Sequence, residues 1–128
     1  MKEMPDTLGI IISWLDADTS ITAVIASTLT GYATGDSWVR VVESPGNQIL
    51  EGLLAAPRFD FNVYSETVEQ ARTLAMKVQR SVLQMKGHTT TDAVITNVST
   101  AVTPFDFTDL INGAPRYVLT MEVFVRPN

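Results

Sequence analysis

The sequence predicts an α+β fold with the element order α-α-β-β-α-β-β, in which one long helix packs on one face of a small, mainly antiparallel four-stranded sheet. Apolar residues recur at helical spacing in three segments, and four other segments are rich in β-forming residues or alternate apolar with polar residues. The chain has 128 residues and no linker rich in Pro, Gly or Ser, so residues 1–128 are expected to form one domain.

Two short helices are expected at the start of the chain. The first spans Pro5 to Ala17, where the apolar residues fall at i, i+3, i+4 and i+7, on one face of a helix: Leu8, Ile11, Ile12 and Leu15. The second is expected between Asp18 and Gly31, with an N-cap among residues 18–20 and a stop at the glycine. Its apolar positions repeat the helical spacing: Ile21, Val24, Ile25 and Leu29.

The pattern then changes to that of strands. The segment 37–43 is rich in β-formers and is expected to end at the turn Pro45-Gly46-Asn47. The segment 58–64 alternates strictly, with three apolar side chains on one side and polar side chains or Tyr64 on the other. Between these strands, residues 48–56 are expected to form a long loop with apolar contacts.

A long helix and a second strand pair complete the expected fold. Thr67 to Gln70 fit a capping box, and a helical stripe follows as far as Gly87: Ala71, Leu74, Ala75, Val78, Val82 and Met85. A helix of about 20 residues would be about 30 Å long, enough to cross a four-stranded sheet. The segments 93–103 and 116–126 are expected to form an antiparallel pair joined by a loop at 104–115.

Composition excludes several classes of function. The chain has no cysteine, which excludes disulfides, thiolate zinc sites and thiol nucleophiles. Its 14 acidic and 9 basic residues give a net charge of −5, which disfavours nonspecific binding to nucleic acid. No apolar run approaches the ~20 residues that cross a bilayer. We therefore expect no membrane partner and synthesis in the cytoplasm.

The motifs that might carry chemistry are all incomplete. His88, the only histidine, follows a helix-ending glycine and is expected to be a solvated turn residue. Residues 16–20 resemble the start of a calcium loop but lack its glycine and glutamate, and residues 31–36 lack the lysine of a phosphate loop. Asp106 and Asp109 form an acid pair without a third group. We expect no catalytic, cofactor-binding or metal-binding residue, and a chain that is not an enzyme.

Basic residues on the long helix admit two interpretations. They could form a nucleic-acid surface, but cations near a helix C-terminus also complement its dipole, and a solvated face is the expectation. These residues are Arg72, Lys77, Arg80 and Lys86.

Two expected loops carry more apolar surface than a solvated connection needs. Such side chains either fold back on the core or bind a partner, and the sequence leaves both possibilities open. The candidate interface residues are Ile49, Leu50, Leu53 and Leu54 in the first loop and Phe105, Phe107, Leu110 and Ile111 in the second.

The segments 38–42, 58–65 and 69–75 read WVRVV, RFDFNVYS and EQARTLA. Together with the glycine-bearing loop between the first two, they resemble the tail terminator proteins of long-tailed bacteriophages, and related tail-completion and head-tail joining proteins look similar. The resemblance implies a structural virion protein that forms a ring, typically a hexamer, at the head-proximal end of the tail. Its implied partners are further copies of itself, the tail tube protein and a head-neck connector protein, with DNA only as passing cargo.

Two alternatives remain at this stage. The first is a neck or head-completion protein that binds the portal side of the same particle. The second, from another class, is a small-molecule-binding or enzymatic α+β domain with a pocket between the long helix and the sheet.

Overall fold

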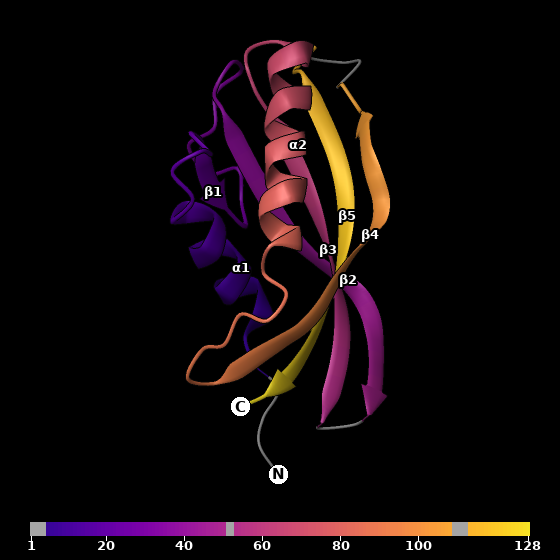
Figure 1. Ribbon diagram of the computed structural model, residues 1–128. Coiled ribbons are helices and arrows are strands. Elements are labelled where there is room, and N and C mark those ends of the chain that lie inside the picture. The colour runs from indigo at the N-terminus through magenta and orange to yellow at the C-terminus, as the bar shows by residue number, and fades with distance from the viewer. Residues whose placement is uncertain (1–4, 51–52, 109–112) are drawn as a thin grey trace.

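The computed structural model describes residues 5–50, 53–108 and 113–128, without the side chains of 45–50 (Figure 1). The elements are α1 (Thr7–Asp16), β1 (Val24–Ala26), β2 (Trp38–Leu50), β3 (Leu54–Tyr64), α2 (Val68–Leu83), β4 (Ala93–Asp106) and β5 (Arg116–Pro127). The strands form a five-stranded sheet in the order β1-β2-β3-β5-β4. β1 is parallel to β2 and the other neighbours are antiparallel, so the sheet is mixed.

The predicted fold class is wrong: the described residues form two helices and a five-stranded mixed sheet, rather than three helices and a mainly antiparallel four-stranded sheet. The expected second helix is replaced by β1 and turns. Most residues between Ser20 and Thr30 are β-branched or serine, which are poor helix formers. The Asp18 carboxylate accepts hydrogen bonds from the backbone N–H and hydroxyl of Ser20, closing a turn instead of capping a helix.

Pairing with β2 decides the conformation of this segment. Val24 to Ala26 align with Trp38 to Arg40, so the edge of β2 gains a short parallel neighbour. The Trp38 indole N–H donates to the Thr28 carbonyl at 2.9 Å and holds the chain against the sheet beyond β1. A non-local partner therefore overrides the local helical spacing.

The expected loop at 48–56 is also wrong, because β2 and β3 continue through it as a long hairpin. The sequence Pro45-Gly46 does not end β2. The register between β2 and β3 shifts between Ser44 and Asn47, a bulge that accommodates a residue without a backbone N–H. Pro104 likewise lies within β4 at a register shift, so Phe105 belongs to a strand and not to the expected loop.

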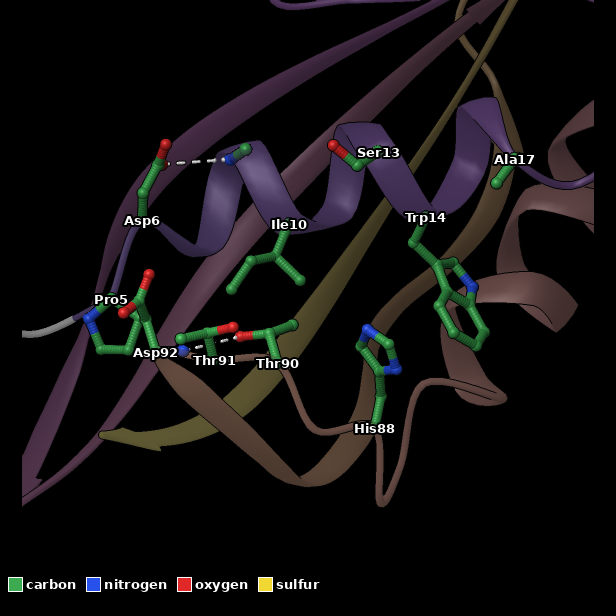
Figure 2. A pocket seen from close by; sticks show the side chains of 11 residues that line it. Pro5, Asp6, Ile10, Ser13, Trp14, Ala17, His88, Thr90, Thr91 and Asp92 are labelled. Atoms are coloured by element: carbon green, nitrogen blue, oxygen red, sulfur yellow. Dashed lines mark hydrogen bonds between the residues drawn. The ribbon is translucent and has the colours of Figure 1, made fainter. Parts of the chain in front are cut away.

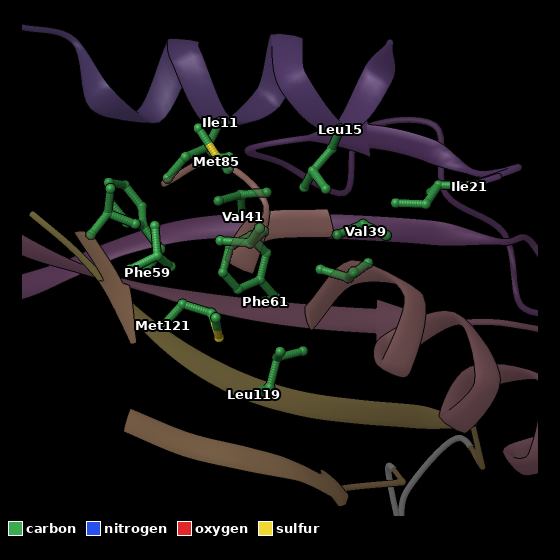
Figure 3. Packing of buried hydrophobic residues seen from close by; sticks show 14 of the residues in the cluster. Ile11, Leu15, Ile21, Val39, Val41, Phe59, Phe61, Met85, Leu119 and Met121 are labelled. Atoms are coloured by element: carbon green, nitrogen blue, oxygen red, sulfur yellow. The ribbon is translucent and has the colours of Figure 1, made fainter. Parts of the chain in front are cut away.

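Both helices pack on the same face of the sheet (Figure 3). Val39, Phe61 and Leu119 lie on this face, and all three are fully buried. Above them lie Ile11 and Leu15 of α1 and the helical stripe expected at residues 71–85, whose six side chains are all buried. None of the helices in the described ranges is long and apolar enough to cross a membrane.

Local signals explain the position of α2. The Thr67 hydroxyl accepts a hydrogen bond from the Gln70 backbone N–H and caps the helix. The helix ends at Leu83, earlier than the expected limit at Gly87. Gly87 has a φ of 87°, a left-handed conformation that lets the chain turn from α2 towards β4 at low cost.

The opposite face of the sheet carries no helix in the described part of the chain. Because side chains alternate along a strand, Asp60, Asn62 and Tyr64 point to this helix-free face while Phe59, Phe61 and Val63 point to the core. The helix-free face holds polar contacts between neighbouring strands. Thr120 donates to the Asp60 carboxylate at 2.7 Å, and Arg58 pairs with Glu122 at 3.2 Å.

Candidate interaction surfaces

The structure places the predicted interface residues at opposite ends of the sheet. Leu50 pairs with Leu54 where the β2–β3 hairpin closes, and Leu53 is 65% exposed there. Ile49 lies in β2, and Leu54 is half-buried. Phe105 and Phe107 lie at the far end of β4, while Leu110 and Ile111 lie outside the described residues.

Phe105 and Phe107 form an exposed aromatic pair on the helix-free face. Phe105 aligns with Val118 of β5, whose side chain points away from the helices, and its own side chain is 40% exposed. Phe107 is 53% exposed, and its ring packs edge-on against that of Phe105 with 5.8 Å between the ring centroids. Exposed phenylalanines in contact are unusual on a fully solvated surface.

Arg116 joins this pair and completes what we call the aromatic knob: Phe105, Phe107 and Arg116. The guanidinium carbon lies 4.6 Å from the centroid of the Phe107 ring, and Nε donates to the Phe107 carbonyl at 3.0 Å. These contacts orient the cation along the aromatic surface. Arg58 and Glu122 form the only ion pair within the described ranges, so Arg116 has no carboxylate partner there.

The aromatic knob ends a row of side chains that crosses the sheet. Trp38 of β2 aligns with Tyr64 of β3, and Tyr64 aligns with Arg116 of β5. Arg116 contacts both flanking rings, since its guanidinium carbon also lies 5.8 Å from the centroid of Tyr64. The sheet register therefore supports the knob from four strands, and this support was not foreseen from the sequence.

Tyr32 covers the other end of the row. Its ring lies 5.9 Å from that of Trp38 and 4.9 Å from that of Tyr64. Its hydroxyl is buried and, within the described ranges, makes no hydrogen bond of good geometry, although the Gly35 backbone lies close enough to influence it. Burial is the main reason that the pKa of Tyr32 is raised, and the neighbouring Tyr64 adds to the effect.

We expect Tyr32→Phe to preserve the fold and to leave its stability unchanged or raise it by up to about 1 kcal/mol, because it removes an unsatisfied buried hydroxyl and keeps the ring contacts. Chemical denaturation of the two proteins measures the difference. A clear loss of stability would mean that the hydroxyl makes a hydrogen bond in solution.

A second surface feature is a pocket between α1 and the turn that precedes β4 (Figure 2). We call it the α1 pocket. Its volume is about 630 Å³, within the ~300–1,000 Å³ range of ligand sites. It is lined by Pro5, Asp6, Gly9, Ile10, Ser13, Trp14, Ala17, His88, Thr90, Thr91 and Asp92.

Hydrogen bonds from other elements fix the walls of the α1 pocket. The Trp14 indole N–H donates to the carbonyl of Ser81 at 3.0 Å and reaches its hydroxyl at 3.2 Å. The His88 ring packs on Trp14 with 4.8 Å between ring centroids. The Thr90 hydroxyl accepts from the backbone N–H groups of Asp92 and Ala93, which holds the turn beneath α1. His88 is half-buried, so it is not the solvated turn residue expected from the sequence.

The α1 pocket is acidic at one end and aromatic at the other. Asp92 lies beside Pro5, and the Asp6 carboxylate lies at the same end of the pocket but reaches along the start of α1 to the Gly9 backbone N–H. The Trp14 and His88 rings lie at the opposite end, and Ile10 points into the space between (Figure 2). No Lys or Arg is among its lining residues. Asp6 already accepts a hydrogen bond from the Gly9 backbone N–H as the N-cap of α1. The pocket therefore suits a group that combines an apolar body with a positive charge.

The candidate chemical residues are not brought together. In the described part of the chain, no three His, Asp or Glu side chains are close enough to hold a metal ion. Asp106 is exposed, and hydrogen bonds from the Thr108 hydroxyl and backbone N–H lower the pKa of its carboxyl group. Asp109, its expected companion, lies outside the described residues. Asp106 is thus held in the ionised form that favours a turn.

No protein-family model matches the chain, and no curated protein matches its sequence. The function proposed below therefore rests on the aromatic knob and the α1 pocket.

Proposed function

We propose that the chain is a structural virion protein that assembles into a ring, typically a hexamer, at the head-proximal end of a bacteriophage tail. In this role it ends polymerisation of the tail tube and joins the tail to the neck of the head. The observation that supports the proposal most is the aromatic knob on the helix-free face. Two exposed phenylalanines pack together there, and Phe107 contacts an arginine that has no carboxylate partner within the described ranges.

An exposed aromatic cluster of this kind is typical of a protein interface. Phenylalanine and arginine are enriched in interfaces, and arginine is among the residue types enriched in hot spots. The hairpin end offers a separate apolar contact, because Leu53 is 65% exposed. A ring subunit at a junction needs contacts to its neighbours and further contacts to the tail tube and the neck, so several distinct apolar sites agree with the proposed role.

A ligand-binding domain is a second candidate, and the α1 pocket is the observation that favours it. The pocket lies between α1 and the turn before β4. A ligand-binding role does not account for the aromatic knob at the far end of β4, so the ring proposal explains more of the surface.

Two measurements test the proposed function: the mass of the oligomer in solution and the binding of the chain to the ends of tail tubes. We expect the purified chain to form a closed oligomer, measured by light scattering, and to bind the ends of tail tubes of the phage that encodes it, seen by electron microscopy. A chain that stays monomeric at every concentration and leaves tube ends bare would overturn the proposal.

A further inference from the structure

We propose that the aromatic knob of one copy docks into the α1 pocket of the next copy, with Arg116 facing the carboxylates of Asp6 and Asp92. This inference rests on the proposed ring and names the two surfaces that would form it. Its occupant is a second copy of this chain.

Charge complementarity supports this pairing. The knob presents a guanidinium that has no carboxylate partner within the described ranges. The α1 pocket presents two exposed carboxylates and no Lys or Arg. Asp92 makes no side-chain hydrogen bond or ion pair within the described ranges, so its charge is available to a partner. Each surface thus supplies the charge that the other lacks.

Shape and apolar character agree with the charges. Pro5, Ile10 and Trp14 give the pocket an apolar wall, and its volume of about 630 Å³ has room for more than one side chain. Phe107 is 53% exposed, and the guanidinium of Arg116 lies over its ring. The phenylalanine ring and the arginine cation can therefore enter the pocket together. The contacts of Trp14 with Ser81 and His88 hold the receiving wall in place before docking, which lowers the entropic cost of binding.

The positions of the two surfaces favour a head-to-tail assembly. Asp92 immediately precedes β4 and Phe107 immediately follows it, so the length of this 14-residue strand separates them. At ~3.3 Å per residue a strand of this length spans about 45 Å. In Figure 1 the turn before β4 lies near α1 at the lower left, and β4 ends at the upper right. A knob cannot reach its own pocket, so contacts would pass from copy to copy until a ring closes.

Cysteine cross-linking tests the contact directly, because the natural chain contains no cysteine. The test variant combines Thr108→Cys, next to the knob but not part of it, with Thr91→Cys at the pocket. The matched control combines Thr108→Cys with Met76→Cys, a residue of α2 that is 49% exposed and belongs to neither surface. Both are oxidised mildly at a concentration where the parent chain is a ring, then separated on a non-reducing gel.

We expect the test variant to give a ladder of covalent oligomers that rises beyond the dimer and is at least tenfold more abundant than in the control. The highest band would report the number of copies in the ring. A covalent dimer that goes no further would indicate a reciprocal two-fold pair and would overturn the inference. Equal ladders in test and control variants would do so as well, because random collision would explain them.

A charge exchange provides the second measurement. Asp92→Arg should weaken self-association at least tenfold, and combining it with Arg116→Glu should recover most of the loss, since the exchanged charges again attract. Independent effects of the two substitutions would contradict the contact. If the parent is a ring but neither experiment supports the contact, the inference fails and the proposed function survives. If the parent never associates, both fail.

Discussion

Phe61→Ala is expected to lower the free energy of unfolding by about 3–5 kcal/mol, the cost of a cavity left by a buried phenylalanine. Phe61 is fully buried in the centre of β3 and is aligned with Val41 on one side and Leu119 on the other. Since this part of the sheet lies beneath α1 and α2, the cavity would remove contacts from both layers (Figure 3). Chemical denaturation followed by circular dichroism measures the loss.

Phe124→Ala is the matched control, because it removes the same ring from the helix-free face. Phe124 is only half-buried, and it neighbours Val123 and Val125, whose side chains point to the core. We expect a clearly smaller loss of stability than for Phe61→Ala. Equal losses would mean that the helix-free face is as well covered as the core, for example by a partner subunit.

The parts of the fold that sequence could predict are those in which one segment holds all the signals. The stripe of α2, its cap at Thr67 and the left-handed glycine at position 87 lie within about 20 residues and agree with one another. The alternation of residues 58–64 likewise predicted which side chains of this strand point to the core, because a period of two residues can be seen within the segment alone.

The errors arose where a distant partner decides the conformation. Val24 to Ala26 become a strand because β2 offers an unpaired edge, and nothing within the segment itself indicates that edge. Pro45 and Pro104 looked like strand ends, but bulges accommodate both. The residue pattern within one segment cannot show which strand of the sheet has a free edge, or where a bulge interrupts the pairing of two strands.

The candidate surfaces divide in the same way. Phe105 and Phe107 could be selected from the sequence, because they place apolar surface on a segment expected to connect two strands. Their support from Tyr64 and Arg116 depends on strand register. The α1 pocket depends on Trp14 meeting Ser81, which is 67 residues away in the chain. Within the expected first helix, Trp14 was the one residue whose type could have pointed to this pocket.

Phe107→Asp is expected to leave the protomer folded and to weaken self-association by roughly 100-fold, the effect of losing an interface hot spot and placing a charge in an apolar contact. The protomer should tolerate the change because residue 107 is more than half exposed, at 53%, and lies beside Arg116, which has no carboxylate partner in the described part of the chain. An aspartate there would also neutralise Arg116 within its own chain, and so remove the cation from the assembly contact. Light scattering over a concentration series measures the association.

Met76→Asp is the control for this substitution, because Met76 is similarly exposed, at 49%, but lies on α2 away from the aromatic knob. It should melt near the parent and assemble like it. If Phe107→Asp unfolds the chain, the ring of Phe107 belongs to the core of the protomer and the interface proposal for the knob fails. If the variant folds and still assembles at the parent's concentration, the subunits meet elsewhere, and the hairpin end around Leu53 becomes the surface to which the same charge substitution applies.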